Sequence, residues 1–168
     1  MSFSIYDASI PTMIRSLTNL SKIMDKAVAQ AKAGNMPLSA LLEARLAPDM
    51  HPFPNQIQIA SDAAKGCAAR LAGVDAPAMP DTEKTFPELQ ARLAKTIEFL
   101  RSVPSAKFAG AEDRTITLNF PGGEMKFSGR DYLTGFALPN FFFHVTTAYG
   151  LLRHKGINIG KMDFLGGV

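Results

Sequence analysis

The stretch Leu138-Pro-Asn-Phe-Phe-Phe-His-Val-Thr-Thr-Ala-Tyr-Gly-Leu-Leu-Arg-His-Lys-Gly156 decides the fold. It is the most apolar and aromatic run in the sequence, and its residues follow helical spacing. Because each residue of an α-helix turns about 100°, Asn140, His144 and Thr147 lie within roughly 60° of one another on one face. A polar stripe on such an apolar helix is either a core hydrogen-bond network or the floor of a binding site. The sequence leaves both interpretations open.

Three earlier segments repeat the apolar spacing of helices with one buried face. The first predicted helix covers residues 9–33 and is stopped by Gly34. The second starts near residue 53, ends before Gly73, and carries a stripe of small residues that favours close helix packing. The third follows Thr85, which forms a capping box with Glu88, and extends to about residue 103.

Between the third and last helices the apolar period changes from helical to two. Residues 115–120 and 125–127 alternate around the turn Pro121-Gly-Gly-Glu124, which predicts a β-hairpin. Pro139 is expected to kink or interrupt the last helix, because proline lacks an N–H. The tail after Gly156 is expected to be extended but packed. The pattern predicts one domain over residues 1–168, an all-α four-helix bundle with a small hairpin inserted before the last helix.

Composition narrows the classes of function. The chain has 168 residues, of which 46% are hydrophobic and 20% charged, as in ordinary globular proteins. The net charge of +3 comes from scattered lysines and arginines, so we expect no nucleic-acid partner. No apolar run reaches the roughly 18–20 residues of a membrane span, so we expect no membrane partner. A lone cysteine, Cys67, and the absence of a signal-like start favour a reduced, cytoplasmic compartment.

The histidines define the metal hypothesis. His144 and His154 lie too far apart along one helix to share an ion. His51 follows a proline-rich corner and meets His144 only if the start of the second helix faces the last helix. A catalytic zinc usually has three protein ligands, so Asp49, Asn140 or Asp62 would have to complete the set. The alternative is that His144 is a hydrogen-bonded core histidine beside Asn140.

Several blocks of the sequence resemble a known group of proteins. They are Leu-Ala-Pro-Asp-Met-His-Pro-Phe-x-x-Gln at 46–56, Thr-Phe-Pro-Glu-Leu at 85–89, the run 139–156, and Ile-Gly-Lys-Met-Asp-Phe-Leu-Gly at 159–166. Together they resemble a bacterial family of uncharacterised proteins in the DinB/YfiT-like superfamily. The resemblance implies an up-down-down-up bundle that is frequently a dimer. Members of the superfamily include metalloenzymes and thiol-dependent transferases that hold a divalent metal through three histidines.

This sequence departs from that metal pattern. The superfamily's last helix carries two histidines about one turn apart; His144 matches the first, but Ala148 stands at the second position. The first-half histidine matches His51 only loosely. The resemblance names zinc or nickel as the metal, but the incomplete ligand set favours a protein without a cofactor.

Three hypotheses follow, and none identifies catalytic residues. The leading one is a small-ligand or degenerate metal site between the second and last predicted helices, in a homodimer. The second is a metal-dependent hydrolase or thiol transferase that uses His51 and His144. The third is a structural dimer without a ligand. The predicted pocket is lined by Asp49, Met50, His51, Gln56, Asn140, His144 and Thr147.

Overall fold

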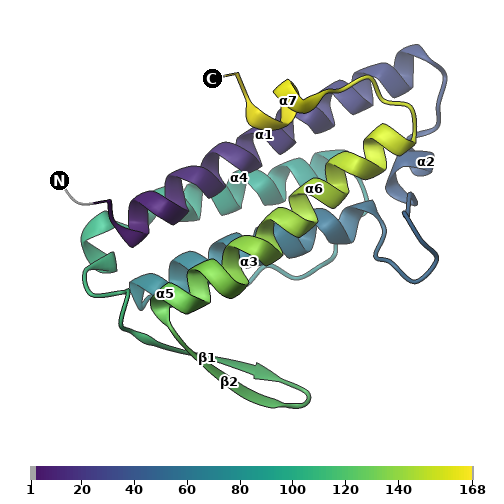
Figure 1. The fold of residues 1–168 in the computed structure, drawn as a ribbon. Coiled ribbons are helices and arrows are strands. Elements are labelled where there is room, and N and C mark those ends of the chain that lie inside the picture. Colours follow the sequence, from purple (N-terminus) through teal and green to yellow (C-terminus); the bar gives the residue numbers. More distant parts are fainter. Residues whose placement is uncertain (1–2, 168) are drawn as a thin grey trace.

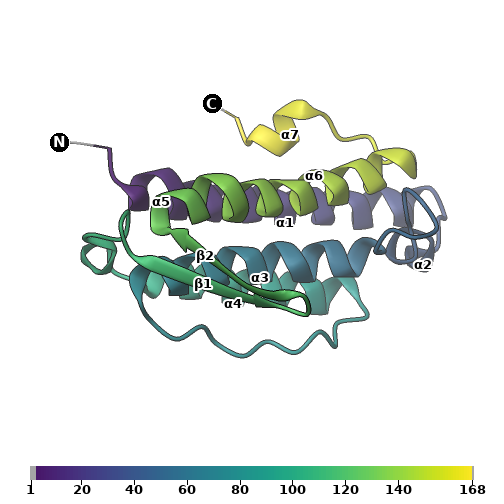
Figure 2. The ribbon, with the colours of Figure 1, turned by 60° about the horizontal axis from the view of Figure 1, so that its bottom comes forward.

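Four long helices form the body of the molecule in this computed structural model, which describes residues 3–167. They are α1 (Ile5–Ala33), α3 (Phe53–Ala72), α4 (Phe86–Ser102) and α6 (Leu138–His154) (Figure 1). Helices α1 and α6 run in one direction, and α3 and α4 run in the other. The connection between α3 and α4 returns along the length of the bundle (Figure 2), so both helices start at the same end. The predicted up-down-down-up bundle is confirmed.

Capping residues set where the helices begin. Helix α1 starts four residues before the predicted position because Ser4 forms a capping box with Asp7. Helix α4 begins as predicted, with Thr85 as the N-cap and the Glu88 carboxylate accepting from the Thr85 N–H at 2.9 Å. The short helix α2 (Leu38–Leu42) and the 3₁₀ turn η1 (Ser105–Phe108) lie in the connections.

The predicted interruption at Pro139 takes the form of a π-helical turn. Helix α5 (Gly129–Tyr132) passes into the π turn η2 (Leu133–Ala137), which leads directly into α6. Pro139 lacks the N–H that would continue the α-helical ladder, and its ring opposes the preceding turn. The wider π turn lies just before Pro139, and the helical ribbon continues from α5 into α6 (Figure 1).

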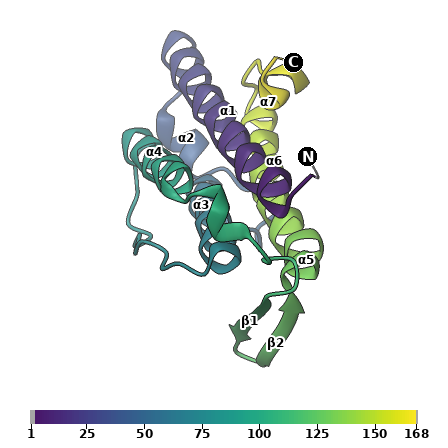
Figure 3. The ribbon, with the colours of Figure 1, turned by 90° about the vertical axis from the view of Figure 1, so that its left-hand side faces the viewer.

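The predicted hairpin consists of β1 (Thr115–Phe120) and β2 (Gly123–Ser128), an antiparallel pair joined by a tight turn. It projects from the bundle beside α5 (Figure 3). Ile116 and Leu118 of β1 are buried, whereas most of β2 is exposed. An isolated hairpin is marginal in water, so its contacts with the bundle hold it in place.

The tail is packed, as predicted, but it is not fully extended. Residues Lys161–Leu165 form the short helix α7, in which the Asp163 carboxylate accepts from the Gly160 N–H. Asn19 of α1 donates to the Phe164 carbonyl at 3.1 Å, and Lys26 forms an ion pair with Asp163. Sequence spacing in this glycine-rich tail indicated no helix, because the helix is too short for an apolar period.

The core is centred on α3, which packs against both α4 and α6. Its inward face carries small side chains that are fully buried: Ala60, Ala64, Cys67 and Ala68. Small residues favour close helix packing, and α3 is central to the bundle, as predicted. Within residues 3–167, none of the helices combines the length and apolar character that crossing a bilayer requires.

Candidate functional site

A hydrogen-bond chain joins the start of α3 to the middle of α6. His144 Nδ1 lies 2.7 Å from Oε1 of Gln56, and Gln56 Nε2 donates to the His51 carbonyl oxygen at 2.9 Å. Gln56 is in the first turn of α3, so its amide reaches back to the residue that precedes the helix. Both His144 and Gln56 are buried. The fold therefore brings His51, Gln56 and His144 together, although Gln56 and His144 are 88 residues apart in sequence.

This chain fixes the proton on the His144 ring. Because Gln56 uses its only donor group on the His51 carbonyl, its oxygen faces His144 and must accept. Nδ1 of His144 therefore carries the hydrogen, and in the neutral ring Nε2 is left with a lone pair. No hydrogen bond to Nε2 comes from residues 3–167, and this atom is not fully enclosed. His144, 8% exposed, thus presents an open hydrogen-bond acceptor.

The surroundings of His144 favour its neutral form. Burial lowers its pKa below the ordinary value of 6.5, and positive charge on the nearby His51 lowers the pKa further. At neutral pH the ring is therefore uncharged. An imidazole in this state accepts a hydrogen bond, takes up a proton or binds a metal ion through Nε2.

Two of the predicted site residues on α6 have different environments. Asn140, one turn before His144, is half-buried and lines a pocket between α3 and α6 with a volume of about 180 Å³. Thr147 is buried, and its hydroxyl donates to the Phe143 carbonyl of the preceding turn at 2.7 Å. Asn140 is therefore available to a ligand, whereas the Thr147 hydroxyl is used within its own helix.

The proline-rich corner contributes less than its sequence suggested. The Met50 side chain is half-buried, and the Met50 carbonyl accepts a hydrogen bond from Arg45. Asp49 is exposed and forms no ion pair with residues 3–167. Neither side chain is joined to the His51–Gln56–His144 chain by a hydrogen bond.

The side chains present do not fit a metal centre with three ligands. Among residues 3–167, no three histidine, cysteine, aspartate or glutamate side chains come together as a ligand group. Ala148 occupies the position one turn after His144 and is fully buried. Only His51 and His144 remain as donors, one fewer than a catalytic zinc usually has.

The pocket beside Asn140 lies between the facing sides of α3 and α6. Its wall from α3 includes Asp62 and Arg70, and its wall from the helix opposite includes Tyr132 and Phe136. The remaining lining residues are Ile59, Ala63 and Ala137. His144 lies one helical turn beyond Asn140 on nearly the same face of α6.

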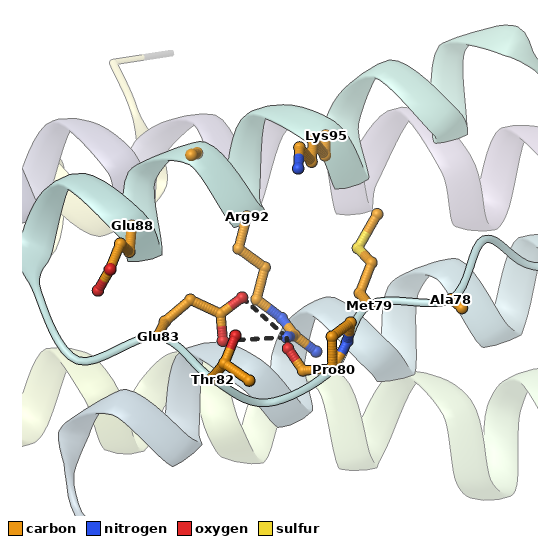
Figure 4. Close-up of a pocket in the computed structure, with 9 residues that line it drawn as sticks. Ala78, Met79, Pro80, Thr82, Glu83, Glu88, Arg92 and Lys95 are labelled. Atoms are coloured by element: carbon orange, nitrogen blue, oxygen red, sulfur yellow. Dashed lines mark hydrogen bonds and ion pairs between the residues drawn. The ribbon is translucent and has the colours of Figure 1, made fainter.

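The most buried charged side chain among residues 3–167 was not predicted from the sequence. The Arg92 side chain, on α4, is only 1% exposed and points toward the α3–α4 connection (Figure 4). It forms ion pairs with Asp62 at 2.8 Å, Asp81 at 2.9 Å and Glu83 at 3.1 Å, and it donates to the Pro80 carbonyl at 3.3 Å. The spacing of Arg92, three residues after Leu89, places it near the buried stripe of α4, but its partners lie outside that helix.

Arg92 fastens the connection to the bundle. Burial raises the pKa of Glu83, but hydrogen bonds from Gln58 and Arg92 outweigh this effect, so the pKa lies below its usual range. A pocket of about 280 Å³ between the connection and α4 is lined by Arg92, Glu83 and Lys95 among others (Figure 4). Because carboxylates already surround the guanidinium, Arg92 is unavailable to an anionic ligand, and we assign it a structural role.

Cys67 is inert, as its position among small residues predicted. It is fully buried in α3, and burial raises the pKa of its thiol to about 12. A thiol that stays protonated at neutral pH is a poor nucleophile and a poor metal ligand.

The fold defines the class of protein. A crystal structure of a DinB family member protein from Shewanella denitrificans matches with a TM-score of 0.91 and 39% sequence identity, over 98% of this chain and 93% of that one. The architecture is therefore DinB-like.

A family match identifies the group more closely. Residues 5–165 match the family described as "Domain of unknown function (DUF1993)", and the chain belongs to this family. Comparison with curated proteins gives no match. The predicted relationship to an uncharacterised DinB-like family is confirmed.

Proposed function

We propose that this protein binds a small molecule at the α3–α6 interface, with neutral His144 accepting a hydrogen bond from the ligand. The observation that carries the proposal is the Gln56 bridge between His51 and His144. It holds the ring in the tautomer that leaves Nε2 free to accept. The pocket one helical turn away adds Asn140 as a second polar group, with the apolar Ile59, Ala63 and Phe136 and the charged Asp62 and Arg70 in its walls. A small number of polar groups among apolar side chains is typical of ligand sites.

The alternative is a divalent-metal-dependent hydrolase or transferase with a reduced ligand set. One observation favours it: histidines that bind metals usually donate their other ring N–H to an oxygen, and His144 Nδ1 does so to Gln56. The pair His51 and His144 falls short of the usual three ligands, so we place this alternative second. Metal analysis of protein purified without an affinity tag separates the two proposals. A stoichiometric ion that disappears in His144→Ala supports the metal enzyme.

The test of the leading proposal is a fragment screen followed by amide NMR. We expect neutral fragments with an N–H or O–H donor to shift the signals of Gln56, Asn140 and His144. The matched variant is His144→Asn, because asparagine keeps an N–H donor for Gln56 and removes the Nε2 acceptor. We expect this variant to lose the fragments while His154→Asn, at an exposed position, keeps them. Equal binding to the wild type and His144→Asn would contradict the proposal.

We also propose that the protein acts as a cytoplasmic homodimer. Support comes from the single cysteine, which is buried, and from large apolar side chains that remain exposed on one chain. The most exposed of these on a long helix is Phe143, which is 56% exposed on α6. Light scattering is expected to give twice the mass of one chain. The mass of one chain at micromolar concentration would contradict the dimer.

A further inference from the structure

The Arg70 side chain is held in place at the hairpin end of the α3–α6 interface. Its Nη1 donates to the Tyr132 hydroxyl at 3.1 Å, and its guanidinium carbon lies 5.8 Å from the centre of the Tyr132 ring. Unlike Arg92, Arg70 forms no ion pair with a carboxylate of residues 3–167. Arg70 is thus an exposed cation that is held against Tyr132 and has no counter-ion among residues 3–167.

Gly66 makes room for this cation. It is buried inside α3, where glycine is unfavourable to a helix because of its backbone freedom. A Cβ atom added at this position would lie 2.4 Å from Arg70 Nη1. The three atoms nearest to that Cβ all belong to the Arg70 guanidinium. The missing side chain therefore lets the guanidinium lie back over the helix, next to Tyr132.

Aromatic rings surround the same place. Tyr132 and Phe136 are stacked with centroids 6.0 Å apart, and Phe120 and Phe127 of the hairpin lie 6.1 and 6.2 Å from Phe136. Phe136 belongs to the π turn, a feature frequently found at functional sites. Two pockets, of about 180 and 310 Å³, share Arg70 and Phe136 in their linings.

Among the described residues, the only carboxylate in either lining is Asp62, and it already forms two ion pairs. Asp62 pairs with Lys65 at 2.9 Å and with Arg92 at 2.8 Å. The second pocket adds Thr117, Leu118, Asn119 and Phe120 of β1, none of them charged. Asp62 is thus paired with two cations, and within residues 3–167 Arg70 is the one basic residue in either lining.

We infer that these two pockets bind a small aromatic carboxylate. Its carboxylate pairs with the planar fork of Arg70, a geometry that suits two parallel hydrogen bonds. Its ring packs against Phe136 and the hairpin. The first of these pockets also contains Asn140 of the proposed ligand site, but Arg70 lies at its other end, since Gln56 and Arg70 are fourteen residues, or about 21 Å, apart along α3.

Cinnamate is a suitable probe, and cinnamamide is its neutral counterpart. In an amide NMR titration at low ionic strength, we expect cinnamate to saturate one site and to shift signals of the π turn and β1. Cinnamamide is expected to bind more weakly, by about fivefold or more, because it lacks the charge that pairs with Arg70. Failure of cinnamate to saturate at millimolar concentration, or equal affinity for the two probes, would overturn the inference.

Variants separate this site from non-specific binding. We expect Arg70→Gln and Gly66→Ala each to weaken cinnamate binding by about fivefold or more, the first by removing the charge and the second by displacing it. Arg101→Gln removes an exposed arginine of α4 and is expected to have no effect. Binding that survives Arg70→Gln overturns the inference. His144→Asn is expected to leave cinnamate binding unchanged. The test of the Arg70 site is therefore independent of the test of the proposed function.

Discussion

At the scale of single residues, Gln56 sets the tautomer and the charge state of the His144 ring. A neutral amide oxygen next to Nδ1–H orients the ring without stabilising a charged imidazolium. A carboxylate at the same position would favour the charged form. We therefore predict that Gln56→Glu moves the pKa of His144 from below 6.5 to above 6.5. NMR titration of the imidazole signals measures this change, and an unmoved pKa would show that Gln56 does not contact the ring in solution.

His144 also makes stability depend on pH. Its pKa is lowered in the folded chain, so the unfolded chain binds a proton first as the pH falls. The stability that neutral His144 contributes is complete above 6.5 and is lost as the pH drops through that value toward the folded pKa. We expect the urea unfolding free energy to decrease over this range in the wild type, and less so in His144→Asn. His154→Asn serves as the control and is expected to behave like the wild type.

Gly66 is expected to show a conflict between stability and binding. Alanine is favoured over glycine in a helix by about 0.8–1.0 kcal/mol, and the atoms nearest to the added Cβ belong to the movable end of Arg70. Gly66→Ala is therefore predicted to raise the unfolding free energy by about 0.5–1 kcal/mol. Chemical denaturation measures the change. A large loss of stability would mean that the glycine is needed for packing and not for the position of Arg70.

At the scale of elements, the α3–α4 connection depends on Arg92. Removing one member of a buried ion-pair network leaves the others without a partner, at a cost of about 3–5 kcal/mol for fully buried groups. Asp62 and Asp81 keep roughly half of their exposure, so we predict a loss of about 2–3 kcal/mol for Arg92→Met. Urea unfolding measures the loss, and limited proteolysis should then cut within residues 74–84.

The control for this prediction is Lys95→Met, which removes an exposed charge from the same helix. We expect its stability and its proteolytic pattern to match those of the wild type. If Arg92→Met also matched the wild type, the network would not be what holds the connection against the bundle.

Helices and hairpin were predictable because their signals are local. Apolar spacing, the Thr85 capping box and the alternation around Pro121 each reflect contacts within a few residues. The early start of α1 was missed because its capping box, Ser4 with Asp7, precedes the apolar period. Helix α7 was missed because five residues carry no period. The π turn before Pro139 was predicted only as an interruption. A proline indicates where the helical hydrogen-bond pattern is broken, but not which backbone conformation the chain adopts there.

At the scale of the whole molecule, the candidate site depends on how α3 and α6 face each other. From the sequence, His51, Gln56 and His144 were predicted to be neighbours only if the start of α3 lies opposite α6. The antiparallel packing of these helices meets that condition and fixes the tautomer of His144, which no local pattern encodes. Arg92 and Arg70 escaped prediction for the same reason. Their roles come from residues of other elements, Asp62, Asp81 and Glu83 for one and Tyr132 for the other.

The central claim is that His144 is a neutral histidine with its proton on Nδ1 and an open Nε2. The most direct test is the pattern of nitrogen signals from the His144 ring, recorded at neutral pH on metal-free protein purified without an affinity tag. We predict a protonated Nδ1, an unprotonated Nε2, and a shift confined to Nε2 when a donor fragment from the screen is added. A protonated Nε2 in the free protein, or an Nε2 signal that no donor fragment moves, would contradict the account.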